Sequence, residues 1–91
     1  MTRITFDPSK RDRTFDERGL DFADAAQVFA GDHLTFQDDR QDYGEPRFIS
    51  IGRLAGRMVV LVWTPRPGAR HMISMRKANE REQRRFEDRL G

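Results

Sequence analysis

The sequence predicts a single α+β domain over residues 1–91, in which an antiparallel sheet packs with two N-terminal helices and is followed by a C-terminal helix. Three observations predict this fold class. Two capped segments with helical apolar spacing occupy residues 7–31, a period-two apolar pattern begins at residue 33, and a capped, charge-rich segment closes the chain. A chain of 91 residues supports one modest core, so we expect no deep substrate cavity.

The first elements are a short strand over residues 3–6 and a helix over residues 8–18. Asp7 is a good N-cap for this helix, Pro8 suits its first position, and Gly19 ends it.

A second helix over residues 22–30 repeats these signals, with Asp21 as its cap and Gly31 as its end. The phenylalanines of this half of the chain are expected in the core: Phe6, Phe15, Phe22, Phe29 and Phe36.

Four further strands are predicted, over residues 33–38, 47–55, 57–65 and 70–75. Ala55 and Gly56 form a tight hairpin turn, and "RPGA" forms another, so the strands are expected to follow one another as an antiparallel meander. The all-apolar run over residues 58–63 predicts the central strand.

Asn79 and Glu82 form a capping box for the last helix. Phe86 and Leu90 are its only large apolar side chains, so it docks along one narrow stripe. Its arginines are expected to face solvent: Arg81, Arg84, Arg85 and Arg89.

Charge is unevenly distributed along the chain. Residues 1–45 hold 6 Lys/Arg and 11 Asp/Glu, whereas residues 46–91 hold 11 and 4. This asymmetry indicates either a surface that binds a polyanion or two halves that attract each other. The chain has no cysteine, which excludes disulfides and thiolate metal sites, and no apolar leader or membrane-length run, so we expect a soluble cytoplasmic protein.

Cations cluster in the sequence around the last strand. Arg76 and Lys77 end it where the final helix begins, and Arg66 and Arg70 from the preceding turn are expected at the same edge of the sheet. Strand alternation puts Arg70, Met72, Ser74 and Arg76 on one face, with His71, Ile73, Met75 and Lys77 on the other.

Five segments occur in one order along the chain: "ITFDPSK", "GLDFADAAQVF", "DDRQDYGEPRFISIG", "VVLVWTPR" and "ISMRKANEREQRRFE". Together they resemble the BrnT family, the ribonuclease toxins of type II toxin–antitoxin modules. The resemblance implies a RelE-like fold and metal-independent cleavage of RNA, without a cofactor, that arrests translation and growth. It also implies neutralisation by a BrnA antitoxin whose ribbon-helix-helix domain binds operator DNA, in a heterotetramer.

The chain departs from the family pattern in three places. "TFDERG" replaces the common Asn-x-x-Lys-His-Gly, His71 stands in a segment that is often arginine-rich, and Phe86 stands where a tyrosine is common. A histidine at the end of the first helix and a tyrosine hydroxyl on the last helix are therefore absent here.

Cleaving RNA without a metal requires activation of the 2′-hydroxyl, neutralisation of the phosphate oxygens and protonation of the 5′-oxygen. Cations suit the second role, so the expected phosphate clamp is Arg66, Arg70, Arg76 and Lys77. His71 is a candidate acid or base, or else an ordinary strand histidine. Glu82 is a candidate base that its capping role already explains.

Candidate RNA-binding residues are Arg81, Arg84, Arg85 and Trp63. Trp63 either stacks on bases or packs in the core. The acidic segment 38–47 resembles a metal site less than a solvated loop with internal pairs to Arg40 and Arg47, so no metal is expected. The alternative function is a non-catalytic module that binds nucleic acid or a protein through the same basic patch.

Overall fold

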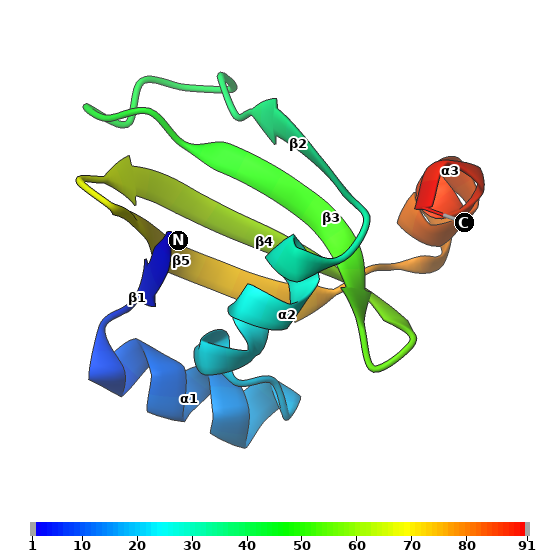
Figure 1. Ribbon diagram of the computed structural model, residues 1–91, viewed down its shortest axis with the longest axis horizontal. Coiled ribbons are helices and arrows are strands. Elements are labelled where there is room, and N and C mark those ends of the chain that lie inside the picture. Colours follow the sequence, from blue (N-terminus) through cyan, green and yellow to red (C-terminus); the bar gives the residue numbers. More distant parts are fainter. Residues whose placement is uncertain (1, 91) are drawn as a thin grey trace.

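The computed structural model describes residues 2–90 and confirms the α+β class. A five-stranded sheet has the order β1-β5-β4-β3-β2, with α1 beside its β5 side and α3 beyond the end of the strands (Figure 1). The elements are β1 (Arg3–Thr5), α1 (Pro8–Arg18), the 3₁₀ helix η1 (Phe22–Asp24), α2 (Ala25–Ala30), β2 (His33–Gln37), β3 (Phe48–Leu54), β4 (Arg57–Arg66), β5 (Ala69–Lys77) and α3 (Glu80–Leu90).

The prediction of an antiparallel sheet is wrong for one strand, β1. β2 to β5 form the expected antiparallel meander with the apolar β4 at its centre, but β1 pairs in parallel with β5, Arg3 opposite Ala69. Hairpin signals specify only pairs that are consecutive in the chain, and β1 joins a strand more than sixty residues away. The sheet is therefore mixed.

The predicted helix caps are confirmed. The Asp7 side chain accepts from the Ser9 backbone N–H, and Gly19 ends α1 in the left-handed region at φ 70°. The second helix is split, because the residues after Asp21 form a 3₁₀ turn before α2. Ala55 and Gly56 both have positive φ, as a tight hairpin turn requires.

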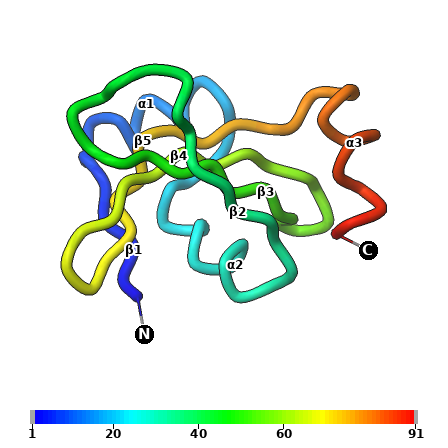
Figure 2. The backbone as a smooth tube through the Cα atoms, turned by 90° about the horizontal axis from the view of Figure 1, so that it is seen from above, coloured from blue at the N-terminus to red at the C-terminus, as the bar shows by residue number. Residues whose placement is uncertain are grey.

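Two apolar clusters cover the two faces of the sheet. On one face η1 and α2 bury Phe22, Ala25 and Val28 against the central strands. On the other, Phe86 and Leu90 of α3 pack on β3 and β4, as predicted. The loop over residues 38–47 lies on the side of the sheet opposite α2 (Figure 2). We call the face of the sheet that α2 covers the α2 face, and the face on which Phe86 and Leu90 pack the α3 face.

Two of the five phenylalanines expected in the core are exposed. Phe22 is buried, and Phe6 and Phe29 pack against the core, but Phe15 is 56% exposed and Phe36 is 43% exposed. Phe15 lies on α1, which buries no residue. Phe36 lies on the edge strand β2 and stacks on Phe86, with ring centroids 6.4 Å apart.

Within residues 2–90, no helix combines the length and apolar character that crossing a membrane requires.

Candidate nucleic-acid interface

A groove of about 380 Å³ lies on the α3 face, between the sheet, the 38–47 loop and α3. Its floor is apolar and comes from β3, β4 and neighbouring rings: Ile49, Ile51, Val60, Val62, Phe36 and Phe86. Its rim is polar and mainly cationic: Arg40, Ser74, Arg76, Arg81, Glu82 and Arg85. Arg76 and Arg40 are ion-paired with Glu82 and Asp38, so Arg81 and Arg85 give the groove its net positive charge, which attracts a polyanion.

Arg76 at the end of β5 is held by Glu82 in the first turn of α3. Arg76 Nη1 and Nη2 donate to Glu82 Oε1 and Oε2 at 2.7 and 2.8 Å. The Arg76 guanidinium lowers the pKa of Glu82 to about 2, and Glu82 raises the pKa of Arg76. Glu82 also accepts from the Asn79 backbone N–H while Asn79 Oδ1 accepts from the Glu82 N–H, so the predicted capping box is confirmed.

Arg40 reaches the groove because a buried carboxylate anchors its loop. Asp38 is only 5% exposed and accepts from Arg40 Nε and Nη2 at 2.8 Å each, and from the Tyr43 hydroxyl. Arg40 lowers the pKa of Asp38 to about 2. The positive charge of Arg40 acts to lower the pKa of Arg76, so the two guanidinium groups lie close enough to repel each other.

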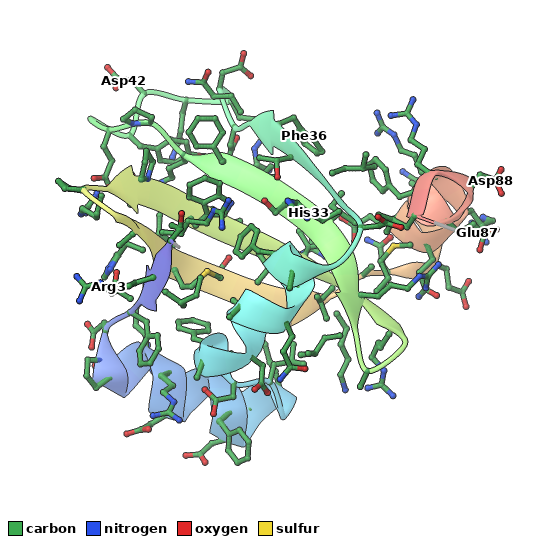
Figure 3. The ribbon with its side chains drawn as sticks, viewed as in Figure 1. Arg3, His33, Phe36, Asp42, Glu87 and Asp88 are labelled. Carbon is green, nitrogen blue, oxygen red and sulfur yellow. The ribbon has the colours of Figure 1, made fainter. Side chains whose placement is uncertain are left out.

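The arginines of α3 divide between the groove and solvent. Arg81 and Arg85 line the groove, whereas Arg84 lies 3.9 Å from Glu80 outside it. Glu87 and Asp88 point away from the sheet on the outer side of α3 (Figure 3). The helix therefore contributes Arg81, Arg85 and one carboxylate, Glu82, to the groove, while its remaining charged side chains lie outside it.

A β-bulge overturns the expected alternation along β5. Ser74 pairs with Val62 and Met72 with Trp63, so Ile73 is an extra residue in the strand. The extra residue reverses the alternation, so side chains before the bulge point to the face opposite to the one that simple alternation predicts from those after it. His71 consequently lies on the α3 face with Arg76, and Arg70 lies on the α2 face, contrary to the prediction.

The expected gathering of four cations at one edge is also wrong. Arg66 and Arg70 lie at the turn end of the β4–β5 hairpin, where they pair with Ala69 and Pro65, whereas Arg76 is six residues beyond Arg70 along β5, roughly 20 Å away. Arg66 forms an ion pair with Glu45 at 3.1 Å. Arg70 lies 4.1 Å over the ring of Phe29.

Lys77 and Trp63 also lie apart from the groove, on the α2 face. Lys77 pairs with Val59, whose side chain is in the α2-face core. Trp63 donates from Nε1 to Ser50 Oγ at 2.8 Å and stacks on Phe48. These contacts fit the expected core packing of Trp63 rather than an exposed ring that stacks on bases.

His71 is engaged at the opposite end of β5 from the groove. Its Nδ1 lies 2.8 Å from the Thr5 hydroxyl on β1. Of the expected phosphate clamp and His71, only Arg76 lines the groove. Glu82, the candidate base that capping explains, lines it too, and Arg81 and Arg85 join from the predicted RNA-binding set.

Sequence reasoning missed Arg40 as a groove residue. Arg40 lies in the acidic segment 38–47, where no apolar periodicity predicts the direction of its side chain. The position of Arg40 depends on the burial of Asp38, to which it is hydrogen-bonded. The alternating charges of the sequence do not reveal that burial.

The groove can hold a phosphodiester. Guanidinium groups donate pairs of hydrogen bonds to phosphate oxygens and stay charged at any physiological pH. Ser74 supplies a hydroxyl and Glu82 a carboxylate, and the apolar floor offers a surface for a sugar or base.

Comparison with curated proteins gave no match. A family model described as the ribonuclease toxin BrnT of a type II toxin–antitoxin system matches residues 6–82, which include four strands of the sheet, both N-terminal helices and the Arg76–Glu82 pair. Toxins of type II systems have a protein antitoxin as partner. The chain therefore belongs to the BrnT family of ribonuclease toxins.

Proposed function

We propose that this chain, as a single toxin domain over residues 1–91 with a RelE-like fold, is a metal-independent endoribonuclease that cleaves RNA and so arrests translation and growth. The observation that carries the proposal is the groove on the α3 face. It combines four arginines, one carboxylate and an apolar floor within the segment that matches a ribonuclease family.

Arg76 is the central phosphate ligand in this proposal. Its planar fork already holds two carboxylate oxygens, and a phosphodiester presents two oxygens in a similar arrangement. Arg81, Arg85 and Arg40 surround it and neutralise the charge that develops on the phosphate oxygens.

Glu82 is the proposed base. When a phosphate takes the Arg76 fork, Glu82 loses the hydrogen bonds from Arg76, the largest cause of its depressed pKa, so its pKa rises from about 2 toward the ordinary value of 4.5. A freed Glu82 accepts the proton of the 2′-hydroxyl, whose oxygen attacks the adjacent phosphorus. The bond to the 5′-oxygen breaks, and that oxygen takes a proton from water.

This route supports metal independence. The nucleophile is part of the RNA, and the arginines supply the positive charge that a metal ion otherwise provides. The products are a 2′,3′-cyclic phosphate and a free 5′-hydroxyl.

We further propose that the partner is a BrnA-like antitoxin with a ribbon-helix-helix domain. The two proteins form a cytoplasmic heterotetramer that reaches operator DNA only through the antitoxin. The family description supports a protein antitoxin. The exposed Phe36 on the edge strand β2 offers such a partner both an aromatic contact and unpaired backbone groups.

The test is incubation of the purified chain with a defined RNA in EDTA, followed by analysis of the product ends. Arg81→Ala and Arg85→Ala each remove a groove charge, and Arg84→Ala removes the same charge from the same helix outside the groove. We expect cyclic phosphate products from the parent and Arg84→Ala, and at least roughly tenfold slower cleavage by the other two.

Intact RNA that binds in a salt-sensitive way would contradict free-RNA cleavage and favour the non-catalytic module. Repeating the incubation with translating ribosomes separates that module from an enzyme that cleaves only on the ribosome. Induction in cells with and without the cognate antitoxin tests growth arrest and its neutralisation.

A further inference from the structure

A second cationic surface lies on one side of α1. Lys10, Arg13 and Arg18 follow one another at three- and five-residue spacing along one side, over roughly 12 Å of helix. Asp12 and Asp16 lie on another side, which faces a separate hollow with Phe15. We call the first three residues the α1 cations.

Polar contacts rather than apolar burial hold this helix in place. None of its residues is buried. Lys10 Nζ donates to the Ile73 carbonyl at 3.3 Å, and Arg18 Nη1 donates to the Met75 carbonyl at 2.9 Å. β1 pairs only with residues 69–71 of β5, so both carbonyls belong to the part of the strand that β1 leaves uncovered. The β-bulge and the free edge of β5 thus orient the α1 cations beside the sheet.

The α1 cations meet the groove of the α3 face at Ser74. A hollow of about 340 Å³ is lined by Lys10, Arg13, Thr14, Glu17, Arg18, Ile73 and Ser74. Ser74 also lines the groove, so the two depressions adjoin across β5. Among residues 2–90, neither Lys10 nor Arg13 forms an ion pair, so both charges are available to a ligand.

We infer that single-stranded RNA leaving the groove crosses β5 at Ser74 and places its flanking phosphates on the α1 cations. The inference rests on the proposed function and adds that recognition extends beyond the cleaved phosphodiester. Three cations against one carboxylate, in a hollow with Ile73 as its only large apolar side chain, suit a phosphate backbone better than the apolar core of a protein interface.

The test compares Lys10→Ala/Arg13→Ala with the control Arg3→Ala/Arg57→Ala. Both double variants remove two exposed positive charges, and Arg3 and Arg57 lie outside both depressions. Binding is measured to a single strand with 2′-O-methyl groups, which cannot be cleaved through the 2′-oxygen, as a function of salt. Thermal midpoints of both variants confirm that they are folded.

Each phosphate contact to a single strand contributes about −0.7 to the slope of log K against log salt. Loss of two contacts is therefore expected to make the slope shallower by about 1.4 in Lys10→Ala/Arg13→Ala, with affinity reduced roughly tenfold. The control is expected to keep the parental slope. Equal slopes in the two double variants, whether changed or unchanged, would overturn the inference.

Cleavage provides a second readout. KM for a long RNA is expected to rise roughly tenfold in Lys10→Ala/Arg13→Ala with kcat unchanged, because the α1 cations do not touch the reacting phosphate. A dinucleoside monophosphate has one phosphate and cannot span both depressions, so parent and variant should cleave it alike. If the parent cleaves neither RNA, the proposed function fails, while the binding slopes still decide the role of α1.

Discussion

Replacing Glu82 with glutamine separates the two roles of this side chain. Glutamine also serves in a capping box, so Glu82→Gln keeps the contact with the Asn79 N–H and removes only the ion pair with Arg76. Glu82→Ala removes both. Comparison of the two variants isolates the ion pair.

The structure sets the size of the effect. Lowering the pKa of Glu82 from 4.5 to about 2 corresponds to about 3 kcal/mol of stability as a ceiling. The Arg76 side chain is 44% exposed, so solvent screening reduces this to about 1–2 kcal/mol. Because the folded pKa is depressed, the stabilisation is fully present above pH 4.5 and is lost as the pH falls toward 2.

Urea unfolding at pH 6 and pH 3 measures this contribution. At pH 6, Glu82→Gln should lower the free energy of unfolding by about 1–2 kcal/mol, and at pH 3 the difference from the parent should shrink by roughly 80–90%. A difference that stays constant between the two pH values would refute the assignment of the depressed pKa to the pair with Arg76.

The same variant distinguishes binding from chemistry. Glu82→Gln frees the Arg76 fork and removes a negative charge, so RNA affinity should be equal or higher. Loss of the base should slow single-turnover cleavage about 10²- to 10⁴-fold. Parental cleavage rates would show that Glu82 is not the base.

Three further substitutions test other parts of the molecule. Gly52→Ala places a Cβ 2.6 Å from Val28 Cγ1 where α2 approaches β3, and should cost about 1–3 kcal/mol in urea unfolding, so parental stability would contradict the close packing. Asp38→Asn releases Arg40 from its charged anchor and should weaken RNA binding about fivefold in a titration, whereas unchanged binding would remove Arg40 from the interface. His71→Ala should leave the cleavage rate and its pH profile within about twofold of the parent, and a large loss of rate would return this histidine to the catalytic residues.

The sequence was sufficient to predict elements with local signals. Asp7 and Gly19 bound α1, Ala55 and Gly56 close a hairpin, and Asn79 with Glu82 starts α3, because each of these signals acts within a few residues.

The sequence was not sufficient where a contact joins distant segments. The parallel pairing of β1 with β5 has no local signal. The bulge at Ile73 inserts one residue without any glycine or proline to mark it. Residues on its two sides that simple alternation predicts on one face therefore lie on opposite faces of the sheet. Residue type alone predicts Phe15 and Phe36 in the core, because phenylalanine is usually buried, but Phe15 is mostly exposed and the Phe86 ring covers Phe36 only in part.

The candidate site was predictable only in part for the same reason. Arg76 was identified because it lies next to the helix cap that holds its partner. Arg66 and Arg70 are close to Arg76 in sequence, but an extended strand carries them to the other end of the sheet.

The most direct test of the groove as the active centre uses two neighbouring cations on opposite faces of β5. Arg76 lines the groove, whereas Lys77 is exposed on the α2 face. Single-turnover cleavage of a defined RNA in EDTA should fall at least 10²-fold in Arg76→Ala and stay within about twofold of the parent in Lys77→Ala, with both variants folded. Equal losses in the two variants, or parental activity in Arg76→Ala, would contradict a catalytic centre in the groove of the α3 face.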